Sequence, residues 1–167
     1  MIWSVVLVET LLFTSMFTST VLLPAIRRPE TGVHNFPPEI QEEYFETHRR
    51  VSAMPRTRRT AAEKTLSFLI STALLTGGAI VAGAQSFRDG ALFAAILYLA
   101  VAAWNTFFID RVLFARLRML RLPGTEHMDK AYAQKWSHVK EKLLPGALIL
   151  TAVSVITGLL VRWIKKL

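Results

Sequence analysis

Residues 91–122 read ALFAAILYLAVAAWNTFFIDRVLFARLRMLRL, and the chain reaches no glycine or proline until Pro123 and Gly124. This stretch predicts one continuous helix, which at about 1.5 Å per residue would be roughly 48 Å long. The hydrocarbon core of a bilayer is only about 30 Å thick, so the helix has to protrude from it. Residues 91–109 are apolar and long enough to cross. The part that starts at Asp110 carries four arginines and must lie at or beyond an interface.

Three further apolar runs have the length of a membrane span. They cover residues 2–26, 62–86 and 143–164, in a chain of 167 residues that is 52% hydrophobic. We expect a single all-α integral membrane domain over residues 1–167, with four transmembrane helices in a bundle and long loops at residues 27–61 and 110–142. Because the first run has neither a basic n-region nor a small-residue cleavage site, it is expected to be retained as a span.

The basic residues are divided unevenly between the two sides of this bundle. Eight of the 20 Lys and Arg residues fall within residues 27–64 and eight more within residues 111–142. The positive-inside rule therefore predicts cytoplasmic loops and outside termini, in a bacterial-type plasma membrane. The net charge of +8 suits loops that face anionic lipids of the bilayer, and we expect no nucleic acid partner.

Residues 37–51 predict an amphipathic helix in the first cytoplasmic loop, since a proline and a glutamate suit its first turn. On a helical wheel one side of this segment carries Ile40, Tyr44, His48 and Val51. The other side is net acidic, with Glu42 and Glu46 among its members. We expect the acidic side to dock on the basic extension of the third span.

Helix-capping patterns predict the remaining boundaries. Thr60 and Glu63 fit a capping box that opens the second span, and Asp89 is expected to cap the third. A second amphipathic cytoplasmic helix, residues 126–144, is expected to begin after Thr125. Pro145 and Gly146 should then turn the chain into the last span.

Small residues recur at helical spacing in the second and fourth runs. The pairs and stripe are Ala73 with Gly77, Gly78 with Ala82, Ala79 with Gly83, and Ala147, Thr151, Ser154 and Gly158. Small side chains let helix backbones approach closely, within one subunit or between copies. We therefore expect a homo-oligomer or a larger membrane complex.

Polar residues inside the spans allow two interpretations each. Glu9 either reaches water near the outer interface or binds an ion or proton. Asn105 either hydrogen-bonds a neighbouring helix or binds a ligand, and Asp110 is expected to be neutralised by Arg111. The threonines four apart in the first run are expected to bond backbone carbonyls one turn back: Thr10, Thr14 and Thr18.

Two groups of arginines flank the predicted spans on the cytoplasmic side. They are Arg56, Arg58 and Arg59 before the second span and Arg116, Arg118 and Arg121 after the third. We expect both groups to bind lipid headgroups.

The four histidines all fall in the two cytoplasmic loops. A metal would need ligands from both loops, and the candidate set is His34, His48 and His127, with Glu39 or Glu126. The segments HNFPPE and PGTEHMD each bring a His and a Glu to a helix start, where an anion can bind. His34, Glu39, Glu126 and His127 are therefore the candidate catalytic residues. With no cysteine in the chain, disulfide and thiolate chemistry are excluded.

Three classes of function remain open. The first is a non-catalytic complex subunit, scaffold or lipid-binding module. The second is a membrane enzyme acting on a lipid or another amphiphile at the cytoplasmic interface. The third is a small oligomeric channel or transporter, which requires Glu9 and Asn105 to face a wet cavity.

Overall fold

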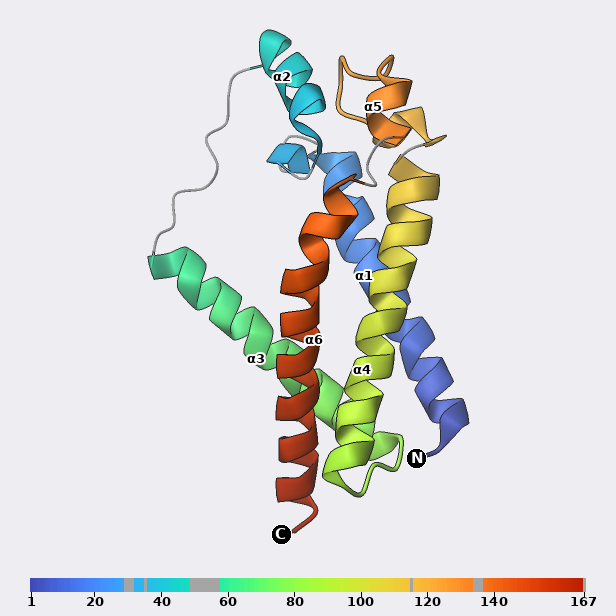
Figure 1. Cartoon of the computed structure of the whole chain (residues 1–167), viewed down its shortest axis with the longest axis vertical. Helices are drawn as coiled ribbons and strands as arrows, with labels where there is room; N and C mark the ends of the chain where they lie inside the picture. The colour runs from blue at the N-terminus through green and yellow to red at the C-terminus, as the bar shows by residue number, and fades with distance from the viewer. Residues whose placement is uncertain (29–31, 35, 49–57, 115, 134–136, 167) are drawn as a thin grey trace. The chain divides into compact units, whose positions relative to one another are not determined.

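The computed structural model describes residues 1–28, 32–34, 36–48, 58–114, 116–133 and 137–166 of the chain (Figure 1). The regular elements over these residues are helical. In chain order they include α1 Trp3–Arg27, α2 Pro38–Thr47, α3 Arg58–Val81, α4 Phe87–Trp104, the π-helix η2 Asn105–Phe114, the 3-10 turn η3 Arg118–Leu120, α5 Asp129–Ala133 and α6 Ser137–Ile164.

Internal contacts divide the chain into two compact units. The first consists of Met1–Thr14, Pro55–Val101 and Leu144–Leu167, and the second of Ser15–Met54 and Ala102–Leu143.

Three helical segments are long and apolar enough to cross a membrane. They are Trp3–Arg27, Phe87–Phe114 and Leu143–Ile164. Large apolar side chains on these helices are exposed, for example Leu11 at 60% and Leu148 at 65%, as a surface in contact with lipid requires. The segments are compatible with the predicted integral membrane location. The fourth predicted span forms α3, whose apolar part, Thr65–Val81, is shorter than the other three.

The prediction of one continuous helix over residues 91–122 is wrong in its second half. The α-helix changes at Asn105 to a π-helix that is described as far as Phe114, and the helical conformation is lost at Leu117. Because π-helical bonding joins residues five apart, it places Ile109 and Phe114 on one face, and both are buried in the same cluster with Leu120. Leu117 then adopts an extended conformation, with φ −87° and ψ 102°. Burial of the residues that follow therefore overrides their helix propensity.

The turn between α3 and α4 is held by two local motifs. Gly83, with φ +80°, ends α3, and the amides of Gly83 and Ala84 donate to the carbonyls of Ile80 and Ala79, as in a Schellman motif. Ser86 precedes α4, Asp89 lies in its first turn, and the two bond each other's backbone amides at 3.1–3.2 Å in a capping box. The sequence predicts Asp89 as the residue before the helix, and it stabilises the helix start from within instead. Gly83 thus ends the helix rather than completing a packing stripe.

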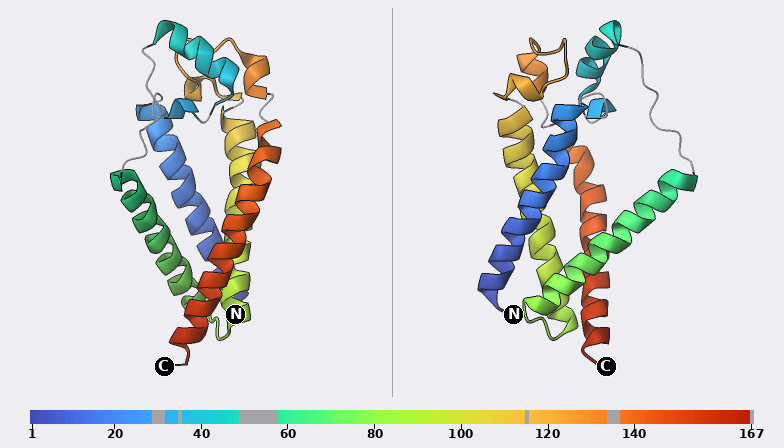
Figure 2. Two further views of the ribbon diagram at one scale, coloured as in Figure 1. Left: turned by 60° about the vertical axis from the view of Figure 1, so that its left-hand side comes forward. Right: turned by 180° about the vertical axis from the view of Figure 1, so that it is seen from behind.

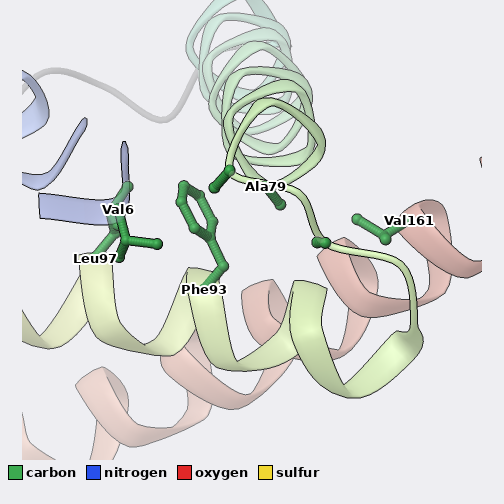
Figure 3. Packing of buried hydrophobic residues seen from close by; sticks show 7 residues of the cluster. Val6, Ala79, Phe93, Leu97 and Val161 are labelled. Carbon is green, nitrogen blue, oxygen red and sulfur yellow. The ribbon is translucent and has the colours of Figure 1, made fainter. Parts of the chain in front are cut away.

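The start of α1 lies beside this turn (Figure 2), where the amide of Ile2 donates to the carbonyl of Ala82 at 2.7 Å. The core of the first unit lies next to it. The ring of Phe93 on α4 points toward Ala79 on α3, and Val6 and Leu97 pack beside it (Figure 3). A Cβ built on Gly158 of α6 would stand 2.6 Å from the carbonyl oxygen of Phe87. The expected close approach of helices at small residues is thus present at this glycine.

The second unit contains two buried clusters. The first is formed by Val33, Ile40, Tyr44, Leu122, Ala131 and Tyr132, and it joins α2 to α5, which lie side by side (Figure 1). The second gathers residues of α1 around Ile109, Phe114 and Leu120. The chain after the third span therefore folds back and packs, instead of continuing as a helix.

Two further predicted boundaries are wrong. The helix expected over residues 126–144 is helical from Asp129 to Ala133, in α5, and again from Ser137, where α6 begins and continues through Pro145 to Ile164. A proline inside a helix removes one backbone hydrogen bond, and membrane helices tolerate this loss where neighbours compensate. Thr60 lies inside α3, so it does not open that helix. Val51 lies outside the described residues.

Candidate functional site

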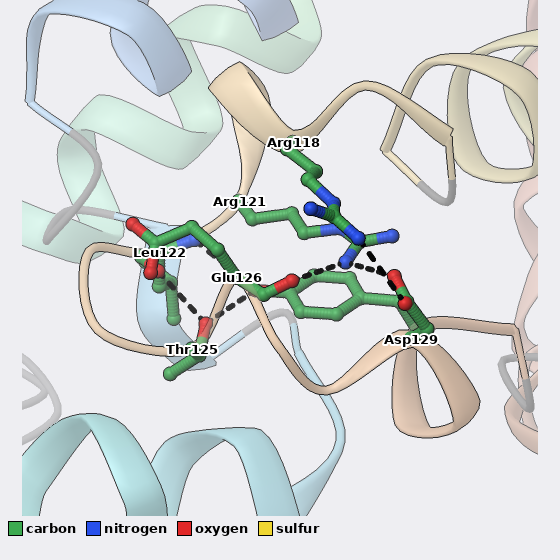
Figure 4. A network of polar contacts seen from close by, with 7 residues as sticks. Arg118, Arg121, Leu122, Thr125, Glu126 and Asp129 are labelled. Carbon is green, nitrogen blue, oxygen red and sulfur yellow. Dashed lines mark hydrogen bonds and ion pairs between the residues drawn. The ribbon is translucent and has the colours of Figure 1, made fainter.

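A dense polar arrangement lies between Arg118 and Tyr132 in the second unit (Figure 4). It begins with a tight turn, in which the amide of Thr125 donates to the carbonyl of Leu122 at 3.1 Å. Pro123 and Gly124 occupy the central positions, and Gly124 has φ +85°, as a type II turn requires. The Pro-Gly pair at this point therefore directs the chain back on itself.

Three polar groups close a ring behind this turn. The hydroxyl of Tyr132 accepts from the amide of Leu122 at 3.1 Å and donates to Oγ1 of Thr125 at 2.8 Å. Oγ1 of Thr125 in turn donates to the carbonyl of Leu122 at 2.8 Å. Tyr132 is 2% exposed, and this burial raises the pKa of its phenol, which stays a hydrogen-bond donor.

A buried arginine, Arg121, joins the residues that follow the turn. The side chain of Arg121 is 3% exposed, and its Nη1 donates to the carbonyl of Glu126 at 2.6 Å and to Oδ1 of Asp129 at 2.5 Å. Its guanidinium lies 4.7 Å from the centre of the Tyr132 ring. Hydrogen bonding to Arg121 lowers the pKa of Asp129, and Arg118, at 3.5 Å, adds to that effect. These charges hold residues 118–132 in one shape.

Helix α2 packs on this segment through its apolar side. Ile40 and Tyr44, which share a face on the helical wheel, are the two buried residues of α2. The ring of His48 stacks on Tyr44, with centroids 4.2 Å apart and planes within 6°. Glu42 and Glu46 are exposed. The predicted docking of α2 through its acidic side is therefore wrong, because apolar burial makes the contact.

The four candidate catalytic residues are all exposed. They are His34, Glu39, Glu126 and His127. His127 pairs with Glu43 of α2, with Nε2 and Oε1 3.6 Å apart, and the ring of His34 faces Phe45 at 6.4 Å between centroids. No hydrogen bond joins any two of the four candidates in the described part of the chain. Their assignment as a catalytic group stays a prediction.

The candidate metal ligands are not gathered. Over residues 1–28, 32–34, 36–48, 58–114, 116–133 and 137–166, no three His, Asp or Glu side chains stand close enough to hold an ion. Nδ1 of His48 lies 2.9 Å from Oγ1 of Thr47 and 3.1 Å from the carbonyl of Tyr44. The set His34, His48 and His127 is therefore not assembled, because His48 is stacked on its own helix.

The candidate headgroup-binding arginines differ in their surroundings. Arg121 is buried and bound to Asp129, and its assignment to headgroup binding stays a prediction. Arg118 remains 71% exposed beside Asp129, and Arg116 is exposed. Arg58 and Arg59 lie at the described start of α3, whereas Arg56 lies outside the described residues. Headgroup binding by the exposed arginines stays a prediction.

The hydroxyls of α1 bond the helix backbone, as predicted. Thr10 and Thr14 donate to the carbonyls of Val6 and Thr10 at 2.7 and 2.6 Å. Thr18 accepts from Nε1 of Trp104 at 3.0 Å, a bond within the second unit. Asn105 and Asp110 are half-buried in η2, where their predicted roles stay predictions.

Glu9 has a different environment from these hydroxyls. Its Oε2 is inaccessible and has no hydrogen-bond partner among the described residues. The atom lies against α3 at Gly78, where a side chain would collide with it. Glu9 as a whole is half-buried, and Oε2 is its oxygen that lies against Gly78. The channel alternative, which requires a wet cavity, stays a prediction.

Sequence reasoning missed Tyr132 and Asp129 as the partners that organise the second loop. The stretch PGTEHMD is more specified than a loop requires, and this was the available signal for Asp129. The hydrogen bonds of Tyr132 could not be predicted, because a single tyrosine forms no sequence motif that identifies its partners.

Comparisons of the chain with protein-family models, with curated proteins and with solved structures found no match.

Proposed function

We propose that the chain is a non-catalytic integral membrane protein that serves as a subunit, scaffold or lipid-binding module of a larger membrane assembly. The observation that carries this proposal is the apolar surface exposed along the spans. On α1 it consists of Leu7, Val8, Leu11, Leu12 and Met16, and on α6 of Leu144, Leu148, Ile149 and Leu159. Apolar surface of this extent is stable against lipid or another protein and unstable in water.

Helix α3 acts as the fourth span in this proposal. Its apolar part, Thr65–Val81, is near the lower limit of about 17 residues for a crossing helix. The contact of Ile2 with Ala82 requires α1 and α3 to run in opposite directions, and Gly90 beside Val161 requires the same of α4 and α6. Four antiparallel crossings satisfy both contacts. The distribution of basic residues then favours termini outside and loops in the cytoplasm.

The open face of α3 supports self-association or a protein partner. Gly77 has no atom within 4 Å of an added Cβ, and Ala73, one turn earlier, is exposed. Small residues four apart allow a second helix to approach closely. The homo-oligomer or larger complex is therefore retained as part of the proposal.

The test is native mass spectrometry of the protein released in a gentle detergent, with metal analysis of the same sample. The proposal expects a closed oligomer, or a complex with a second protein, and no stoichiometric metal. A monomer that carries one stoichiometric metal ion would overturn it and would favour an enzyme.

An interfacial enzyme is the second candidate function. The ion pair of His127 with Glu43, at 3.6 Å, favours it because it joins titratable groups from both loops at the surface. If this pair is catalytic, His127→Ala abolishes turnover of an amphiphile found by the mass measurement and leaves thermal stability unchanged. The exposed Glu42→Ala is the matched control, and equal activity of both variants would exclude a catalytic pair.

A further inference from the structure

Glu9 is the one carboxylate in α1, and the sequence of that helix holds no other ionisable residue before Arg27. It lies about two turns inside the helix. Its Oε2 is inaccessible and receives no hydrogen bond from the described residues. A carboxylate oxygen in that state is unfavourable, because burial removes its hydration and nothing replaces it.

Glu9 can lie against α3 because residue 78 is a glycine and has no side chain. A Cβ added to Gly78 would stand 2.6 Å from Oε2 and 3.3 Å from Cδ of Glu9, and 3.1 Å from Cζ of Phe93. The carboxyl group and the edge of the aromatic ring thus share the space that the glycine leaves open. Any other residue at position 78 would push the carboxyl group out.

The groups around this contact decide what the carboxyl can bind. A metal cation takes several oxygen ligands at once, and among the described residues no group of three or more His, Asp or Glu side chains that could hold one includes Glu9. A proton needs only the carboxyl itself. Protonation removes the charge and leaves a neutral group that suits apolar surroundings.

We propose that Glu9, packed against Gly78 and Phe93, is a proton-binding site and carries its proton in the folded protein at neutral pH.

The helices that surround this contact carry few ionisable groups. The apolar part of α3, Thr65–Val81, contains no ionisable residue. The ionisable residues of α4 are Arg88, Asp89 and Tyr98. Asp89 accepts a hydrogen bond from the hydroxyl of Ser86 at the helix start. The α-amino group of Met1 and Arg162 of α6 stand near the helix ends. The cluster that encloses Phe93 is otherwise apolar, including Val6 and Leu97.

Release of the proton would change the packing of the first unit. A charged carboxylate beside the Phe93 ring has to move toward water, because no donor is present to hold it. The contact of α1 with α3 at Gly78 then opens. The packing of α1 against α3 thus depends on whether Glu9 is protonated, and therefore on pH.

The direct test is infrared difference spectroscopy of the full-length protein in lipid vesicles. A protonated carboxyl group has a C=O absorption that an ionised one lacks. We expect this band in the wild type at pH 7 and its loss in Glu9→Gln, which keeps the shape and carries no proton. Absence of the band in the wild type at pH 7 would overturn the proposal, as would its persistence in the folded Glu9→Gln variant.

A second measurement needs no variant. Hydrophobic carbodiimides add to protonated carboxyl groups in apolar surroundings, and peptide mass spectrometry locates the adduct. We expect labelling at Glu9 at pH 7, decreasing as the pH is raised, and little labelling at the exposed Glu39. No adduct at Glu9, or labelling that does not depend on pH, would show an ionised or water-exposed carboxylate.

Discussion

At the scale of single residues, glycine determines how closely two helices approach in the first unit. A Cβ on Gly158 would stand 2.6 Å from a backbone oxygen of Phe87 and 2.8 Å from its ring, so the helices have to separate. We expect Gly158→Ala to lower the free energy of unfolding by about 1–3 kcal/mol. Thermal unfolding in detergent measures this loss.

Gly146→Ala, on the same helix, is the matched control for that substitution. Its Cβ would make only an ordinary contact, 3.6 Å from the Tyr98 hydroxyl, and alanine favours a helix over glycine by up to about 1 kcal/mol. An equal loss of stability in both variants would show that close packing at Gly158 is not the cause.

Tyr132 offers a test of the hydroxyl ring. Tyr132→Phe leaves the amide of Leu122 without its buried acceptor, and we expect a loss of about 1–3 kcal/mol in unfolding free energy. Tyr98→Phe is the control, because the Tyr98 hydroxyl makes no hydrogen bond among the described residues. If both substitutions cost the same, the ring does not stabilise the second loop.

Asp129 makes the stability of the same loop depend on pH. Its pKa is lowered by the bond from Arg121, so the folded chain binds the proton more weakly than the unfolded chain. The stabilisation is complete above the ordinary Asp pKa of about 3.9 and is lost as the pH falls through the lowered value. Asp129→Asn should therefore lower the melting temperature at pH 7, and the difference from wild type should vanish in acid.

The control for this pH series is Glu126→Gln. Glu126 receives the Arg121 bond on its backbone carbonyl, so its side chain is not needed. A melting difference for Asp129→Asn that persists unchanged into acid would contradict the role of the carboxylate.

At the scale of elements, α2 shows why short helices need a partner. A helix of ten residues is marginal alone, and α2 is held by the burial of Ile40 and Tyr44 against α5. Ile40→Ala should cost about 2–5 kcal/mol and speed amide hydrogen exchange in both α2 and α5. Glu42→Ala, at an exposed position, should leave exchange unchanged. Faster exchange in α2 alone would mean that the two helices fold independently.

The third span illustrates what a helix pattern can and cannot predict. Its apolar part up to Trp104 forms an α-helix, as the absence of glycine and proline indicates. The switch to a π-helix at Asn105 depends on the joint burial of Ile109 and Phe114, and the extended conformation at Leu117 on the burial of Leu120 and Leu122. Local propensity contains no information on those partners, so the boundary could not be predicted.

At the scale of the whole molecule, membrane orientation is the prediction to test. The chain has no cysteine, so single substitutions report their side without background. A cysteine in place of Arg88 should react with an impermeant thiol reagent on intact cells, and one in place of Glu126 only after the membrane is opened. Both positions are exposed. The reverse pattern would invert the orientation. Labelling of both cysteines from outside would mean that α4 does not place positions 88 and 126 on opposite sides of the membrane.

The sequence by itself determined three apolar spans, the local bond between Asp89 and the start of α4, and the backbone hydrogen bonds of Thr10 and Thr14 in α1. These follow from composition and from spacing along one helix, where the partners lie within a turn. Only the tertiary structure decided that Arg121 is buried on Tyr132, that α2 docks through its apolar side, and that Glu9 meets Gly78. Each of those contacts joins residues distant in the chain, and a contact between distant residues depends on the packing of the whole unit.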